Sequence, residues 1–317
     1  MHTAVKIFLV AFFLGIDGGG SKTRCVLGDE QTLLASGSSS GCNVLRVGEA
    51  CAQSSLQAAI HEACVQAGVS PRVIMRTCAG VAGGGRREIA EVLRRVIAGI
   101  VDGEVEVTGD TEIAFEAAFG SPPGVIIISG TGSMAYGKNA RGETARAGGW
   151  GHAISDEGSG HWIGVAAIRE AMRFHDRGES PGLLQDLIAA VGAKSVEELV
   201  VTVNKNPEPD FAALFPLVLA AAEAGDPVAD AVLKCAGGWL AELAHIVIRR
   251  LFNGAAQVRV AAHGGVLTSS AWVKDSLVER LRAQWPGVDF VCGEVYPAGA
   301  ALERARRGTG RMAVGPS

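Results

Sequence analysis

The chain has 317 residues, of which 48% are hydrophobic and 20% are charged, and its formal net charge is −4. This length suits two domains of ordinary size better than one continuous core. The composition argues against a long disordered tail, and the weakly acidic balance gives no electrostatic footprint for nucleic acid. We therefore expect a well-buried globular protein with no nucleic-acid partner.

The chain begins with an apolar run, KIFLVAFFLG, which resembles the hydrophobic part of a secretion signal. The run is too short to cross a bilayer, lacks a small-residue cleavage site and continues without a break into LGIDGGGSKT. We interpret it as an extended first strand of a cytoplasmic protein with no membrane partner. The seven cysteines are odd in number and contain no CxxC pair, which predicts reduced, buried thiols without a structural zinc site.

The hydrophobic pattern predicts strands with helical crossovers twice over, hence an α/β fold whose second half carries a helical insertion. In the first half we expect a strand up to Asp17, a glycine turn and a strand, then a turn at 29–31, a strand at 33–36, a polar loop at 36–43, a helix at 48–67, a strand at 73–79, a helix at 86–100, a strand ending at Asp110 and a helix after it. In the second half we expect strands from 125 and 134, helices at 160–177, 181–191, 196–203, 210–224 and 227–252, a strand at 258–262, a helix at 269–284, a strand at 288–292 and a helix at 297–307. The expected domains are residues 1–118, with a C-terminal helix at 297–310 packing back on them, and residues 119–296.

Two glycine turns between strands are the main functional signal. One follows Asp17 and runs from Gly18 to Thr23; the other runs from Ser129 to Ser133 and adds the hydroxyls of Thr131 and Ser133. Such a turn lets backbone N–H groups converge on an anion without obstruction by Cβ atoms. Neither turn is a Walker A loop, because the first continues as a strand where that motif requires a helix. A plain glycine hairpin is the alternative, but the duplication favours two similar halves facing each other across a cleft.

Two aspartates at strand ends are candidates for phosphoryl-transfer chemistry. Asp17 could hold Mg²⁺ through water, and Asp110 could accept the proton of an attacking hydroxyl. The alternative for Asp110 is a helix cap.

The segment GGWGHAISDEGS, from Gly148 to Ser159, is a candidate sugar platform, because carbohydrate hydroxyls bind carboxylates and backbone acceptors. The alternatives are that Trp150 belongs to the core and that Ser155 or Asp156 caps a helix. His152 and His161 lack a metal-ligand spacing and are interpreted as structural.

The segment VAAHGGVL allows close backbone approach by a flat nucleoside at its two glycines. Gly237 and Gly238 lie within an expected helix, where they indicate close approach either by a ligand or by another helix.

The segments LGIDGGGSKT, VTGD, IISGTGS, GGWGHAISDEGS and AAHGGV resemble, in order and spacing, the actin-like ATPase superfamily. Within it the chain is most similar to the N-acetylglucosamine kinase branch of the BadF/BadG/BcrA/BcrD ATPase family. This resemblance implies two actin-like domains with mixed sheets hinged about a cleft, a homodimer, and ATP with Mg²⁺ as cofactors. The implied reaction is phosphorylation of the 6-hydroxyl of an amino sugar, N-acetylglucosamine in the first place.

The resemblance also implies a role for each matching residue. Asp110 would be the catalytic base and would contact the sugar, and Asp17 would be the acid on the magnesium side. The remaining implied contacts are Gly19, Gly20, Ser21, Lys22, Thr131 and Gly132 to phosphate, Gly237, Gly264 and Gly265 to adenosine, and Asn43, Trp150, Gly151 and Asp156 to the amino sugar.

Three alternatives to an N-acetylglucosamine kinase stay open. The substrate could be glucosamine or N-acetylmuramic acid. The protein could be an ATPase that activates a 2-hydroxyacyl-CoA dehydratase, although the absence of cysteine between Cys78 and Cys235 removes the expected iron–sulfur ligands. It could also be a sensor that binds sugar without turnover, although such a protein would need neither Asp17 nor Asp110.

Overall fold

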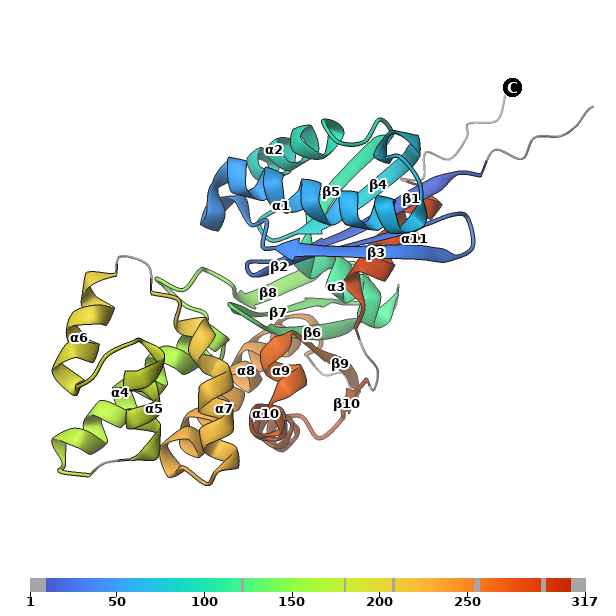
Figure 1. The fold of residues 1–317 in the computed structure, drawn as a ribbon. Coiled ribbons are helices and arrows are strands. Elements are labelled where there is room, and N and C mark those ends of the chain that lie inside the picture. The colour runs from blue at the N-terminus through green and yellow to red at the C-terminus, as the bar shows by residue number, and fades with distance from the viewer. Residues whose placement is uncertain are drawn as a thin grey trace, which may run out of the picture. The chain divides into compact units, whose positions relative to one another are not determined.

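A glycine-turn hairpin opens each of the two units into which the chain divides. The computed structural model describes residues 10–120, 123–179, 181–206, 209–253, 257–291 and 295–308. One unit comprises Met1–Gly120 with Val295–Ser317, and the other comprises Ser121–Glu294 (Figure 1). Each contains a five-stranded mixed sheet flanked by helices, which confirms the predicted fold class.

The sheet of the first unit has the order β3-β2-β1-β4-β5. β2 pairs with β1 and β3 in antiparallel fashion, whereas β4 pairs with β1 and β5 in parallel. The elements are β1 (Phe12–Gly18), β2 (Lys22–Gly28), β3 (Leu33–Ser40), α1 (Val44–Ala67), η1 (Pro71–Val73), β4 (Ile74–Val81), α2 (Arg87–Ala98), β5 (Glu104–Gly109), α3 (Asp110–Phe119) and α11 (Pro297–Arg307).

Alternate residues of β1 face two different helix layers. Leu14 and Ile16 belong to the apolar cluster formed with α1 and α2, whereas Phe13 belongs to the cluster formed with α3 and α11. Because side chains alternate between the faces of a strand, Asp17 lies on the face of α3 and α11. Gly15 is on that face too, and a Cβ there would overlap the backbone of Ala298 and Leu302. The missing side chain therefore lets α11 pack directly on the central strand.

The sheet of the second unit has the order β10-β9-β6-β7-β8. Its antiparallel and parallel pairings repeat those of the first unit, with β6 in the place of β1. The elements are β6 (Gly124–Ser129), β7 (Ser133–Lys138), β8 (Thr144–Gly148), α4 (Gly160–Asp176), α5 (Gly182–Ala190), α6 (Val196–Lys205), η2 (Phe211–Leu214), α7 (Phe215–Glu223), α8 (Pro227–Leu251), β9 (Val258–His263), α9 (Gly265–Ser269), α10 (Ala271–Gln284) and β10 (Val288–Phe290).

Helix α8 is the central helix of the second unit. It is long and apolar enough to cross a membrane by composition alone, but most of its apolar residues between Val228 and Ile248 lie in the core cluster of this unit, and Trp239 and Ile246 are exposed. Burial against the sheet and against α10 therefore explains its composition.

Two predicted boundaries were wrong. The polar loop expected at 36–43 is in large part strand, because β3 pairs with β2 as far as Ser40. Small residues are needed in this edge strand, since a Cβ at Gly37 would overlap the backbone of Ala59 and Ala63 in α1. The helix expected at 269–284 is α10, which begins later, at Ala271, because the Ser270 hydroxyl accepts the Val273 N–H at 3.3 Å and caps it; Ser269 ends the separate short helix α9.

Three other expected bounds fall partly outside the described residues. They are the strand expected at the N-terminus, of which β1 begins at Phe12 and residues 1–9 are not described, the end of the strand expected at 288–292, and the last two residues of the segment 297–310.

Candidate functional site

The first glycine turn is held by one backbone hydrogen bond of its own and by one from each of two neighbouring segments. Gly19 N–H donates to Lys22 O at 2.9 Å and closes the turn, Cys42 N–H donates to Gly19 O at 3.2 Å, and Ala82 N–H donates to Gly18 O at 2.8 Å. Gly20 is half-buried, and Ser21 and Lys22 are exposed. The expected phosphate contacts thus lie on a fixed turn whose tip is open.

Asp17 lies one residue before this turn, in a row of side chains across the sheet. It is in register with Arg24 of β2 and Gly80 of β4, and Gly80 is in register with Thr108 of β5. Burial and, to a smaller extent, the negative charge of Asp110 raise the pKa of Asp17 to about 6, against the opposing effect of the positive charge of Arg24. Asp17 is therefore a partly protonated acid near neutral pH that is electrostatically coupled to Asp110.

Asp110 is the first residue of α3, directly after β5. Its Oδ1 accepts the Thr111 N–H at 2.8 Å and the Thr111 hydroxyl at 3.3 Å. Burial raises the pKa of this carboxyl, and the hydrogen bonds from Thr111 lower it. The N-cap position belongs to Gly109. Asp110 thus binds one N–H of the helix start without being its cap, and its Oδ2 is not engaged by these bonds.

The donor set suits magnesium bound mainly by substrate. Mg²⁺ in phosphoryl-transfer sites takes one or two carboxylates, water and phosphate oxygens. Asp17 and Asp110 supply two carboxylates of raised pKa, whose ionised forms a cation would stabilise. Among the described residues no group of three or more ligating side chains is present, so these residues fit a phosphate-bound Mg²⁺ and not a cage of protein ligands.

Asn43 has a structural duty that sequence reasoning did not consider. It is the N-cap of α1, and its side chain accepts the Leu45 N–H at 3.1 Å. The helix is kinked at Gly48, so Asn43 begins a short turn that precedes the main helix. An Asn in this position leaves its amide N–H₂ as a donor for a ligand.

The second glycine turn is covered by Asp156. Ser133 N–H donates to Asp156 Oδ1 at 3.4 Å, and a Cβ at Gly132 would lie 3.0 Å from Asp156 Oδ2. The hydroxyls of Ser129 and Ser133 donate to Gly158 O and Glu157 O at 2.8 and 2.7 Å. Ser133 is therefore occupied by the 156–158 segment, and the expectation that its hydroxyl binds phosphate was wrong. Thr131 and Gly132 stay as the predicted phosphate contacts of this turn.

Asp156 has an unusual backbone and a shielded carboxylate. Its φ is +74°, which makes it the one non-glycine residue with positive φ among the described residues. It is buried, and burial raises its pKa against the hydrogen bond from Ser133 and the charge of His152. Positive φ is uncommon for a residue that carries a side chain, and Asp is one of the residues that adopt it most readily. The helix-cap alternative was wrong, because Ser159 caps α4.

Trp150 is not a core residue. Its side chain is 59% exposed, and the Arg146 guanidinium lies 4.1 Å above its ring centre. Gly151 follows in open space with φ of +92°. The ring centres of His152 and His161 lie 4.7 Å apart with their planes tilted by 40°.

The glycines expected at the nucleoside differ in their surroundings. A Cβ at Gly264 would overlap the Ser129 backbone, whereas the space around Gly265 is open. A Cβ at Gly237 would overlap Val273 and Ser276 of α10. The structure therefore favours helix packing over ligand contact at Gly237.

Two pockets are lined in part by residues to which the sequence analysis assigned no role. Arg24 and Lys22 line a pocket of about 290 Å³ with Tyr296. Lys234 and Trp272 line a second pocket, of about 620 Å³, between α8 and α10. Arg24 could have been found from the sequence, because it lies two residues after Lys22 on a strand and so on the same face of the sheet. Lys234 and Trp272 have no local sequence pattern that would have indicated a pocket.

Two units of one topology, each with a glycine turn at the end of its first strand, define the class of actin-like ATPases. Within that class, the sequence model of the BadF/BadG/BcrA/BcrD ATPase family matches residues 14–302, and the chain belongs to this family. This result confirms the resemblance stated from the sequence.

Characterised relatives and a solved structure resemble the chain over nearly its whole length. The N-acetylmuramic acid/N-acetylglucosamine kinase of Clostridium acetobutylicum is 33% identical over 88% of this chain and 93% of its own. The N-acetyl-D-glucosamine kinase of Dictyostelium discoideum is 27% identical over 92% of this chain and 96% of its own. The crystal structure of a putative N-acetylglucosamine kinase from Chromobacterium violaceum has a TM-score of 0.74 at 25% identity, covering 93% of this chain and 98% of its own.

Proposed function

We propose that the protein is an ATP-dependent kinase that phosphorylates the 6-hydroxyl of an amino sugar, with N-acetylglucosamine as the first candidate. The observation that carries the proposal is the pair of acids Asp17 and Asp110 at the ends of β1 and β5. Relatives named as amino-sugar kinases support the choice of substrate class.

In the first unit, Asp110 is the proposed base. Its carboxylate, oriented by Thr111, accepts the proton of the sugar hydroxyl as that oxygen attacks the γ-phosphate in line. The raised pKa moves this group towards neutral pH, where a base accepts a proton most effectively. Asp17 would hold Mg²⁺ through water, and Mg²⁺ would supply charge neutralisation at the phosphates. Gly19, Gly20, Ser21 and Lys22 are the proposed phosphate contacts of this unit.

In the second unit, Thr131 and Gly132 are the proposed phosphate contacts. Gly264 and Gly265 would lie against adenosine, and the 620 Å³ pocket beside α10 has a size that suits a nucleoside. Trp272 gives this pocket an aromatic surface. Gly237 is not proposed to touch adenosine itself, because α10 covers it; its proposed role is to let α10 pack closely on α8.

The amino sugar is proposed to contact Asn43, Trp150, Gly151 and Asp156. An exposed indole and a shielded carboxylate are the combination that a sugar ring and its hydroxyls require. Unlike N-acetylglucosamine, N-acetylmuramic acid carries a carboxylate in its substituent at C3, so binding it would need a positively charged side chain beside that position. Glucosamine lacks the acetyl group, and its acceptance would need an acid beside C2.

The finer parts of the proposal are Mg²⁺ dependence, a cytoplasmic location and a homodimer. The six described cysteines are free thiols, which suits a reducing compartment. Family resemblance is the support for the homodimer, and size-exclusion chromatography with light scattering tests it.

An ADP-release assay across a panel of sugars tests the proposed function. The panel contains N-acetylglucosamine, glucosamine, N-acetylmuramic acid and glucose, with a reaction lacking sugar as the control. We expect release that depends on an amino sugar and on Mg²⁺. Release at the same rate without any sugar would contradict the kinase and favour an ATPase that activates a dehydratase, and binding of sugar without any release would favour a sensor.

A further inference from the structure

The last helix of the chain contacts the strand and the helix that lead into and out of Asp110. Ala298, Ala301, Leu302 and Ala305 of α11 share one apolar cluster with Ile113 of α3. A polar contact adjoins this cluster, because Arg304 of α11 reaches Glu112 of α3, 192 residues away in sequence.

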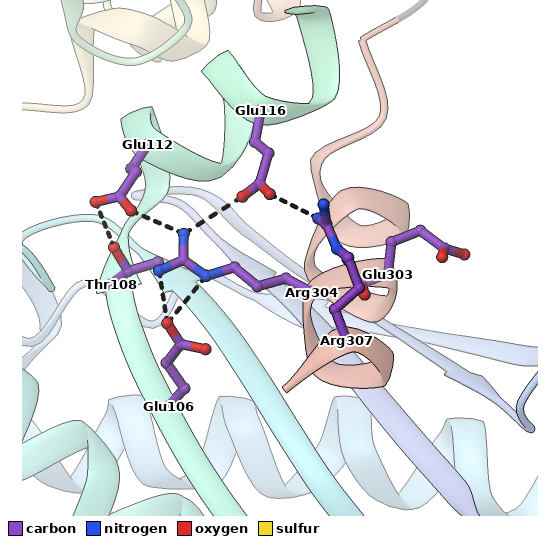
Figure 2. A network of polar contacts seen from close by, with 7 residues as sticks. All are labelled: Glu106, Thr108, Glu112, Glu116, Glu303, Arg304 and Arg307. Carbon is purple, nitrogen blue, oxygen red and sulfur yellow. Dashed lines mark hydrogen bonds and ion pairs between the residues drawn. The ribbon is translucent and has the colours of Figure 1, made fainter. Parts of the chain in front are cut away.

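Arg304 binds carboxylates from both β5 and α3 (Figure 2). Its Nε and Nη2 donate to Glu106 Oε1 at 2.9 and 2.6 Å, and its Nη1 donates to Glu112 Oε1 at 2.7 Å and to Glu116 Oε2 at 3.3 Å. Arg307 donates to the other oxygen of Glu116 at 2.6 Å. One planar guanidinium therefore ties the strand before Asp110 to the first two turns of the helix after it.

The charges in this network depend on Arg304. The side chains of Arg304, Glu106 and Glu116 are 25%, 20% and 21% exposed, so water screens them only in part. Without Arg304, Glu106 and Glu112 would lose the guanidinium that binds both of them in Figure 2, whereas Glu116 would keep its ion pair with Arg307. Repulsion between Glu106 and Glu112 would then separate α3 from β5 at the point where the chain passes from one to the other.

The junction between β5 and α3 relies on this network in place of an ordinary cap. Its N-cap residue is Gly109, which has no side chain to accept a helix N–H. Instead, the Thr108 hydroxyl donates to Glu112 Oε2 at 2.8 Å, and the other oxygen of Glu112 is the one that Arg304 binds. The Glu112 carboxylate therefore binds Thr108, at the end of β5, with one oxygen and Arg304 with the other. These two contacts fix the ends of the short segment that contains Gly109 and Asp110.

We propose that Arg304 is a positioning residue that holds the β5–α3 junction and thereby the direction of the Asp110 carboxylate. The inference rests on the proposed kinase function for its catalytic consequence. Arg304 acts through Glu112 and the helix start and does not itself touch Asp110. The C-terminal helix thus completes the catalytic half of the first unit.

Three variants test the proposal. Arg304→Gln removes the charge, and Arg304→Lys keeps the charge but loses the planar fork. Arg306→Gln is the matched control on the same helix, because Arg306 donates to Asp29 O and Thr32 O, both at 2.7 Å, and not to α3. We expect Arg304→Gln to lower kcat roughly 10- to 100-fold with both KM values within about threefold, since small misplacements of a catalytic group have effects of this size. Arg304→Lys should fall in between, and Arg306→Gln should keep kcat even if its Tm falls.

Hydrogen exchange gives a second readout that needs no activity. The amides of residues 114–118 in α3 should exchange faster in Arg304→Gln than in wild type, and should be unchanged in Arg306→Gln. Unchanged exchange, or an unchanged kcat in an active enzyme, would overturn the positioning role. A wild-type protein without sugar-dependent turnover would instead overturn the proposed function, and the exchange rates would still decide whether Arg304 holds the junction.

Discussion

The two glycine turns share a topology but differ in charge. In the first unit, the last two pairs of the hairpin are Asp17 with Arg24 and Gly18 with Thr23. In the second, the corresponding pairs are Ile128 with Met134 and Ser129 with Ser133. The fold thus provides the anion-binding turn twice, but it places a carboxylate beside the turn on a strand only once. This difference is the reason why we propose that proton transfer and metal binding belong to the first unit.

The largest expected effect is that of removing the proposed base from the first unit. Asp110→Asn keeps the hydrogen bond from Thr111 but cannot accept a proton, so turnover should fall by roughly 10²- to 10⁴-fold with substrate binding largely kept. Steady-state ADP release with saturating sugar measures the loss. Normal turnover in this variant would show that Asp110 is not the catalytic base.

Asp17→Asn should lower turnover by less than Asp110→Asn does, but should stabilise the fold at neutral pH. The folded-state pKa of Asp17 is about 6, above its ordinary 3.8, so the folded protein binds more protons between these values and loses stability as pH rises through them. The ionised carboxylate then costs about 3 kcal/mol at pH 7, which Asn would remove. The Tm of the variant should exceed that of wild type at pH 7, and the difference should vanish near pH 4. An equal Tm difference at both pH values would contradict a buried, charge-coupled Asp17.

Alanine substitutions in the two turns test what they share. A Cβ at Gly130 meets open space, and one at Gly19 makes an ordinary 3.5 Å contact, so Gly130→Ala and Gly19→Ala should both fold normally. If phosphate occupies the space beside each turn, each variant should raise the KM for ATP about tenfold, the equivalent of 1.4 kcal/mol. Gly182→Ala, at the start of α5, is the control. An unchanged KM in either turn variant would remove that turn from the ATP site.

The smallest expected effects are those of two substitutions at Asp156. Comparing them distinguishes the contribution of its backbone conformation to stability from the contribution of its charge to sugar binding. Asn adopts positive φ more readily than most residues, so Asp156→Asn should fold like wild type, whereas Asp156→Ala should lose about 1 kcal/mol of stability. Both variants should raise the KM for the amino sugar. Chemical denaturation and sugar titrations measure the two properties, and an unchanged KM in both variants would exclude Asp156 from the sugar site.

The sequence was sufficient for the parts of the site that depend on local pattern. Apolar strands that run into glycine-rich segments predicted both turns and located Asp17 at the end of the first strand, and a strand followed by a helix located Asp110. Contacts between distant segments left no such signal. Asp156 meets Ser133 across 23 residues, and Arg304 meets Glu106 across 198. Gly237 looked like a ligand contact because a glycine that accommodates a helix and one that accommodates a nucleotide give the same local pattern.

The same reason explains the wrong boundary of β3. Ser36 to Ser40 have the composition of a loop, and only pairing with β2 together with the close packing of α1 on Gly37 makes them a strand. Tertiary contacts therefore overrode local propensity at this edge of the sheet.

The most direct test of a division of labour between the units measures N-acetylglucosamine binding and turnover in parallel for Asp110→Asn and Asp156→Asn. Isothermal titration in the presence of a non-hydrolysable ATP analogue gives the binding constant, and ADP release gives kcat. We predict that Asp110→Asn binds the sugar and fails to turn it over, whereas Asp156→Asn binds it weakly and keeps a substantial kcat at saturation. The reverse pattern, or equal losses of binding and turnover in both variants, would contradict the assignment of catalysis to the first unit.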